Sequence, residues 1–218
     1  MKIDDLNQRA KQKFGEWTTE ENRQQARNVI ERHWESTKAA FWGMPLEAWL
    51  APFVCIFGIL LIYLSPWNEL ASKPTQEIVA PVIIGMTAIV SLFVHRWVGE
   101  TFTLILACFA WALFIRELHI PLSNNGFYIA IFAIAWWVSN QRFELAQWFS
   151  YKWIRIFLGG AFWTYLITKV FDRHYVSFLP AYNSWNNHVE ETLEACGHGM
   201  VFALVIATLR IGLTRKSN

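Results

Sequence analysis

The chain has 218 residues, of which 54% are hydrophobic and only 17% are charged, and it contains 13 tryptophans and 17 phenylalanines. This composition excludes an ordinary soluble domain. The formal net charge of +2 does not argue for nucleic-acid binding and the sequence has no DNA or RNA motif, so no nucleic-acid partner is expected. The sequence therefore predicts an all-α, polytopic membrane protein.

The N-terminal segment, residues 1–44, is polar and carries charges of both signs. Residues 18–21 are typical of a helix start, and the predicted helix continues to about residue 41. We expect a cytoplasmic amphipathic helix that lies on the membrane surface or binds a protein partner. Its apolar face carries Ile30, Trp34, Thr37 and Phe41.

Residues 45–218 form the predicted transmembrane domain, a bundle of about six spans in the lipid bilayer. Each apolar stretch of roughly 17 to 22 residues is long enough to cross about 30 Å of hydrocarbon as a helix. No cleavable signal peptide is visible before the first stretch, so that stretch is expected to act as the insertion signal. The fourth stretch has the shortest apolar run. The spans are Ala48 to Pro66, Ile78 to Val94, Thr101 to Leu118, Phe127 to Ser139, Ile154 to Phe171 and Ala195 to Leu213.

The positively charged residues predict the orientation of the bundle. Of the 19 lysines and arginines, all but four fall on one side of the predicted spans, and the positive-inside rule makes that side cytoplasmic. Both termini are then cytoplasmic, and a bacterial inner membrane is the expected location. The exceptions, on or near the outer side, are Lys73, Arg116, Lys169 and Arg173.

Short polar segments connect the predicted spans. Residues 95–100 are expected to form a tight inner turn, which makes the second and third spans antiparallel neighbours. Residues 68–77 and 172–194 are expected to be outer loops, and residues 121–126 an outer turn. Residues 142–152 are amphipathic and are expected to lie along the inner interface.

Acidic and histidine side chains gather at the outer ends of these spans. Carboxylates and imidazoles are costly near hydrocarbon, so such a group needs partners, a bound cation or a function. The group therefore predicts a site on the outer face of the bundle. Its members are Glu69, Glu77, Glu117, Asp172, Glu190, Glu191, Glu194, His119, His174, His188 and His198.

The entry to the sixth span is the most acidic part of this group. Glu191, Glu194 and His198 recur at the spacing of one helical face, so they can point at one object. Carboxylates this close repel one another unless one is protonated, an arginine intervenes or a cation binds. Glu190, in contrast, is explained by the helix dipole as an acid in the first turn.

Two other spans end in an acid followed two residues later by a histidine. Glu117 and His119 can converge only if the helix ends between them, and Pro121 favours that ending because it disfavours helical geometry at the preceding residue. Asp172 and His174 repeat the arrangement without a nearby proline. If the third, fifth and sixth spans are neighbours, these side chains and those of the sixth span line one outer pocket.

One hypothesis for this pocket is a divalent-metal enzyme that acts on a lipid-like or envelope substrate. Mixed imidazole and carboxylate ligands suit Zn, Mn or Fe, and an open metal site can activate water for hydrolysis. In this hypothesis Glu117 or Asp172 is a ligand or general base, and Arg116 or Arg173 binds an anionic group. The metal ligands are Glu191, Glu194, His198, His119 and His174.

Two other interpretations of the same residues stay open. In the first, Arg116 and Arg173 neutralise the acids, the histidines are structural, and the protein is a non-enzymatic membrane scaffold. In the second, the group handles protons or cations as part of a transporter. Few ionisable residues continue inward from the outer rim, which favours a site at one face over a path across the membrane.

The three cysteines do not predict a disulfide framework. Cys55 and Cys108 lie in predicted spans, and Cys196, near the outer surface, is expected to be a free thiol packed between helices. The sequence contains no Gly-rich phosphate loop, serine nucleophile elbow or Cys-x-x-Cys pair. No motif therefore names a reaction.

Overall fold

The computed structural model describes residues 24, 27, 28, 31, 43–120, 123–173, 175, 178 and 182–217. The chain divides into two units, Met1–Met44 and Pro45–Asn218. In the first unit the described residues are 24, 27, 28 and 31, which are helical and exposed, and 43 and 44, which lie outside any helix. The predicted apolar face of the N-terminal helix, and with it the predicted partner-binding surface, lies outside the described residues.

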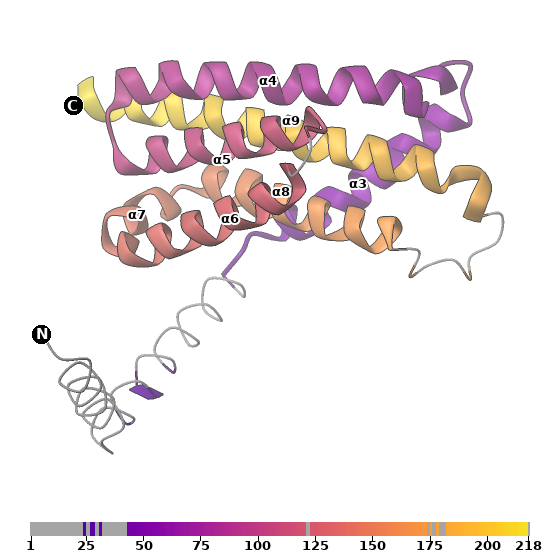
Figure 1. Cartoon of the computed structure of the whole chain (residues 1–218). Coiled ribbons are helices and arrows are strands. Elements are labelled where there is room, and N and C mark those ends of the chain that lie inside the picture. The colour runs from indigo at the N-terminus through magenta and orange to yellow at the C-terminus, as the bar shows by residue number, and fades with distance from the viewer. Residues whose placement is uncertain are drawn as a thin grey trace, which may run out of the picture. The chain divides into compact units, whose positions relative to one another are not determined.

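The described part of the second unit is entirely helical (Figure 1). Its helices, in chain order, are α3 (Leu46–Tyr63), the short 3-10 helix η1 (Asn68–Ala71), α4 (Lys73–Val98), α5 (Thr101–Glu117), α6 (Ser123–Asn140), α7 (Arg142–Phe149), α8 (Lys152–Asp172) and α9 (Tyr182–Ser217). Among the described residues there is no β-strand. The predicted all-α class is therefore confirmed.

Four helices are long and apolar enough to cross a membrane: α3, α4, α8 and the part of α9 from His188 onward. The other two predicted spans also form helices, α5 with 17 residues and α6 with 18, but neither is among these four candidates. The structure thus supports a helical membrane bundle with four candidate spans. The count of six stays a prediction, because it requires α5 and α6 to cross as well.

Two helices begin earlier than the sequence predicts. α4 starts at Lys73 within the predicted outer loop, because Pro74 occupies the first turn, where its missing N–H group costs nothing. α9 starts at Tyr182, not near Ala195, so Glu190 lies about two turns inside the helix and the first-turn explanation for it was wrong. The polar residues at the start of α9 have weak helix propensities, and the packing of α9 against η1 stabilises the helix there. In this contact His188 Nδ1 lies 2.9 Å from the Ala71 carbonyl oxygen.

The predicted tight turn between α4 and α5 contains only two residues, Gly99 and Glu100. Gly99 adopts a left-handed backbone conformation (φ 76°) and its N–H donates to the His95 carbonyl, which ends α4. Glu100 then precedes the first residue of α5 in extended geometry. The two helices are consequently antiparallel neighbours that pack along their lengths.

α9 is the central helix of the bundle and packs against α3, α4, α5 and α8. In Figure 1 it runs beside α4 for most of its length. Two glycines allow α9 to approach its neighbours closely. A Cβ at Gly212 of α9 would lie 2.6 Å from a Val98 methyl group of α4, and a Cβ at Gly160 of α8 would lie 3.0 Å from Met200 Sδ of α9. The main core is apolar and includes Ile84, Leu113 and Leu204.

A group of polar contacts joins the start of α5 to α7 and to the C-terminal part of α9. We call it the Glu100 cluster, and its members are Glu100, Gln147, Trp148 and Arg215. Glu100 accepts hydrogen bonds from Trp148 Nε1 at 2.8 Å and from Arg215 Nη1 at 2.9 Å. Arg215 also donates to Gln147 at 2.8 Å, and its guanidinium group lies over the Trp148 ring, 5.2 Å from the centroid. The sequence did not predict this cluster.

The outward face of α6 is apolar. Ile129, Phe132 and Trp136 follow one another at helical spacing and each exposes 70% or more of its surface. Such a stripe is unusual on a soluble protein and is compatible with contact to lipid.

Candidate functional site: a buried histidine network

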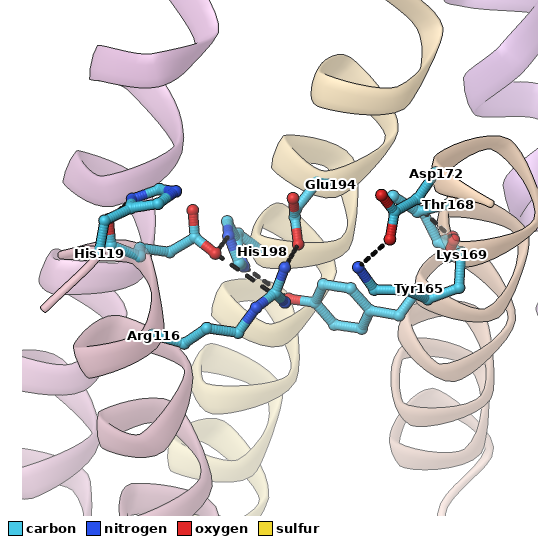
Figure 2. A network of polar contacts seen from close by, with 10 residues as sticks. Arg116, His119, Tyr165, Thr168, Lys169, Asp172, Glu194 and His198 are labelled. Carbon is cyan, nitrogen blue, oxygen red and sulfur yellow. Dashed lines mark hydrogen bonds and ion pairs between the residues drawn. The ribbon is translucent and has the colours of Figure 1, made fainter. Parts of the chain in front are cut away.

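Five polar side chains from three helices meet at the C-terminal end of α5 (Figure 2). We call them the His198 network. Two come from α5, one from α8 and two from α9, so the predicted adjacency of the third, fifth and sixth segments is present in the structure. The members are Arg116, Glu117, Tyr165, Glu194 and His198.

His198 is the centre of the network and is fully buried, with 0% of its surface exposed. Its Nδ1 atom lies 2.5 Å from the hydroxyl oxygen of Tyr165. Its Nε2 atom lies 3.5 Å from Glu117 Oε1, which is longer than an ordinary N–H···O hydrogen bond but within ion-pair distance. The imidazole therefore stands between a phenol and a carboxylate.

Arg116 connects the two acids of the network. Its Nη2 atom donates to Glu194 Oε1, and its Nη1 atom lies 4.0 Å from Glu117 Oε1. The side chains are mostly buried, with exposures of 16% for Arg116, 14% for Glu194 and 8% for Glu117. The guanidinium group also lies 5.5 Å from the centroid of the Phe127 ring on α6. One arginine thus links α5 to α9 and lies beside α6.

A glycine positions Tyr165 against His198. A Cβ at Gly197 would lie only 2.8 Å from Tyr165 Cε1 and 2.9 Å from Cζ, so the aromatic ring occupies space that any other residue would fill. The ring centroids of Tyr165 and His198 are 5.6 Å apart. The contact between the phenol and the imidazole therefore depends on Gly197 as well as on the two side chains themselves.

Four of the residues singled out from the sequence come together in this network: Arg116, Glu117, Glu194 and His198. The ending of α5 is also as expected, because the helix stops at Glu117 and His119 takes a left-handed conformation (φ 50°). His119 is nevertheless exposed, and its Nδ1 atom lies 2.7 Å from the backbone oxygen of Glu117.

The other predicted site residues lie elsewhere or outside the description. Asp172 pairs with Lys169 on its own helix at 2.8 Å, and Figure 2 shows this pair beside the network. Arg173 is exposed just after α8, and Glu191 is half-buried one turn before Glu194. His174 is not among the described residues.

The predicted metal ligands do not gather into a metal-binding group within the described part of the chain. No set of three or more His, Cys, Asp or Glu side chains there could hold an ion. The physical reason is visible in the network: the Arg116 guanidinium lies between Glu117 and Glu194, where a metal bound by both carboxylates would have to sit.

Comparison with known proteins does not assign the chain to a family. The chain matches no protein-family model, no curated protein and no solved structure. Any function therefore has to be inferred from the residues and their geometry.

Sequence reasoning missed Tyr165, the Glu100 cluster and the role of Gly197. Tyr165 is a single hydroxyl within an apolar span, and such a residue is usually read as part of a lipid-facing or core surface. Glu100 and Arg215 are far apart in the sequence, so only the fold brings them into contact. The sequence signal that could have indicated this cluster is the Glu100 carboxylate in the short turn between two apolar segments.

Proposed function

We propose that this protein is a non-enzymatic, proton-linked membrane component whose His198 network binds and releases one proton. The observation that carries the proposal is the burial of His198 between the Tyr165 hydroxyl and the Glu117 carboxylate. Histidine is the side chain whose unperturbed charge change falls near neutral pH, and buried ionisable groups inside a membrane bundle are typically functional.

The charge balance of the network supports this proposal. With His198 neutral, the charges of Arg116, Glu117 and Glu194 leave one net negative charge in a buried place. One proton on the imidazole removes that net charge and lets the ring donate to both of its neighbours. A proton bound at His198 therefore changes both the net charge and the hydrogen bonds of the network.

Proton binding has a direct route to the packing of the helices. Glu117 contacts both His198 and Arg116, and Arg116 in turn contacts Glu194. When His198 becomes charged, Glu117 is drawn toward the imidazolium and Arg116 is left more strongly paired with Glu194. Because these residues belong to α5 and α9, the proton alters the forces between the two helices.

A site at one end of the bundle fits the surrounding polar groups better than a conduit does. The buried hydroxyls of Thr87, Ser91 and Thr208 donate to carbonyl oxygens of their own helices. Thr168, on the other side of Tyr165, donates to the Thr164 carbonyl in the same way. Because these hydroxyls donate within their own helices, they do not form a chain of hydrogen bonds between helices. This favours a proton that is bound and released at one end of the bundle.

The topology completes the proposal. In a bacterial inner membrane with six spans and both termini in the cytoplasm, the His198 network lies near the outer surface and responds to external pH. The charged or titratable groups that face His198 are Arg116 and Glu117 from α5, Tyr165 from α8 and Glu194 from α9, with His119 beside Glu117. Asp172 and Lys169, near the C-terminal end of α8, pair with each other.

The deciding experiment is a histidine titration by ¹⁵N NMR of the whole protein in lipid nanodiscs, with the His198 signal assigned by its loss in H198Q. The proposal predicts that the ring signals of His198 change with pH and that the midpoint of thermal unfolding varies with pH in a way that H198Q abolishes. H188Q, which alters a half-buried histidine of α9, is the matched control and should keep that pH dependence. His198 ring signals that do not change over the pH range in which the protein stays folded would refute the proposal.

The metal-dependent enzyme inferred from the sequence is a separate proposal with its own test. Elemental mass spectrometry of the detergent-purified protein and of an E194A/H198A double variant measures any bound Zn, Mn or Fe. A stoichiometric metal that is lost from the variant supports a metal site and justifies a hydrolase assay with lipid-like substrates. Because Arg116 fills the space between the carboxylates, we expect no stoichiometric Zn, Mn or Fe in either protein.

A further inference from the structure

Helices α3 and α9 are antiparallel, and their contacts form a ladder in which one turn back on α3 goes with about one turn forward on α9. At one end of their interface the rings of Tyr63 and His188 lie 5.2 Å apart. Four residues back on α3, Ile59 packs in a cluster with Leu193, which follows His188 by five residues on α9. Each step of four residues moves about one turn along both helices in opposite directions.

The next step of this ladder pairs two cysteines. Cys55 precedes Ile59 by four residues and packs on the same cluster, while Cys196 follows His188 by eight. Both thiols are free and half-buried. The contacts on either side of this step, Tyr63 with His188 and Ala51 with Met200, place the two cysteines opposite each other.

A third sulfur occupies the step after that. Met200 follows Cys196 by four residues, and Ala51 precedes Cys55 by four. A Cβ at Gly160 of α8 would lie 3.0 Å from Met200 Sδ and 3.1 Å from the Ala51 methyl group, so these residues meet at one point. The small Ala51 and Gly160 leave room for the thioether, and Cys196 and Met200 share one face of α9.

We propose that Cys55, Cys196 and Met200 form a binding site for a soft monovalent metal ion, Cu(I) or its analogue Ag(I). Thiolate and thioether sulfurs select soft ions, whereas Mg²⁺, Ca²⁺ and Mn²⁺ prefer oxygen ligands. Binding releases the two thiol protons, and the negative thiolates attract the ion, which leaves the occupied site with one net negative charge. The Thr164 hydroxyl, 3.7 Å from Met200 Sδ, helps to orient the thioether.

This site is distinct from the His198 network. Residues two apart on a helix diverge by about 200°, so Cys196 and His198 project from opposite sides of α9. His198 faces α5 and α8, whereas Cys196 faces α3. The sulfur site therefore does not depend on the proposed proton-linked function.

The test is a titration of the full-length, detergent-purified and fully reduced protein with Ag(I), followed by Cu(I) in competition with a chromophoric Cu(I) chelator. We expect one ion per chain in the wild type. C55S and C196S should each weaken binding by at least about 100-fold, and M200L by about 10-fold. C108S and M86L are the matched controls, because Cys108 and Met86 are exposed on α5 and α4, and both should bind as the wild type does.

Two results would overturn the proposal. One is unchanged stoichiometry and affinity in the C55S/C196S double variant, with its helical circular dichroism intact. The other is a reduced wild-type protein that binds neither ion. If the unreduced protein then shows a Cys55–Cys196 disulfide by mass spectrometry, the pair is an oxidisable dithiol and not a metal site. C55A/C196A, whose side chains are smaller and apolar, replaces the serine variant if serine prevents folding.

Discussion

Replacing Gly197 with alanine adds one methyl group at the contact that holds Tyr165 against His198. The added carbon would lie 2.8 and 2.9 Å from two ring carbons of Tyr165, closer than Cβ atoms are found in folded proteins. To reach ordinary contact the ring has to move by about 0.6 Å or more, and overpacking of this kind costs about 1 to 3 kcal/mol. Alanine returns up to about 1 kcal/mol through its higher helix propensity. We therefore expect G197A to lower the free energy of unfolding by about 1 to 2 kcal/mol.

The measurement is unfolding in mixed detergent micelles, followed by circular dichroism as the fraction of denaturing detergent increases. G199A is the matched control, because nothing lies within 4 Å of a Cβ at Gly199 on the same helix. Its stability should equal or slightly exceed that of the wild type. If G197A proves as stable as G199A, the ring does not occupy the space of a Gly197 side chain and the explanation for its position is wrong.

A second substitution separates crowding from other effects of G197A. Y165L shortens the side chain and removes the ring atoms that the new methyl group would meet. The two substitutions should therefore be non-additive: G197A should cost clearly less in the Y165L background than in the wild type. Equal costs in the two backgrounds would show that the methyl group meets something other than Tyr165.

Two further predictions concern the other ion pairs of the bundle. R215M removes the hydrogen bonds from Arg215 to Glu100 and Gln147, so we expect it to lower the free energy of unfolding by about 1 to 2 kcal/mol in the same assay. R210M, at an exposed arginine of the same helix, is the control and should change this free energy by less than about 0.5 kcal/mol. A loss of equal size in both would remove the Glu100 cluster as the cause. D172N breaks only an exposed pair with Lys169 and should cost no more than about 1 kcal/mol; a larger loss would mean that Asp172 has a partner beyond its own helix.

Much of the fold could be predicted because hydrophobic length is a local property. The apolar runs place α3, α4 and α8 within a few residues of their observed bounds, and the glycine after α4 marks the turn before α5. Helix ends that depend on packing were predicted less well. α9 extends far into the region expected to be a loop, and His188 and Val189 in its N-terminal part pack against η1 and α3.

The candidate site was predicted in part for a similar reason. The spacing of Glu194 and His198 on one helical face follows from the sequence alone, and both side chains belong to the observed network. The choice of Arg116 as the partner of the acids was one of several interpretations left open. The pairing of Asp172 with Lys169 is consistent with their i, i+3 spacing. The hypothesis of a shared outer pocket instead assigned Asp172 to the site.

The sequence by itself determined that this is an α-helical membrane protein with its acids and histidines gathered at one end, because the cost of placing polar groups in hydrocarbon acts on each segment separately. Only the tertiary structure decided what those groups do to one another. It placed the Arg116 guanidinium between two carboxylates, brought the Tyr165 hydroxyl to a buried imidazole through the missing side chain of Gly197, and set Cys55 opposite Cys196. These contacts join residues from different helices, so they depend on the register and the close approach of the helices, which no single segment encodes.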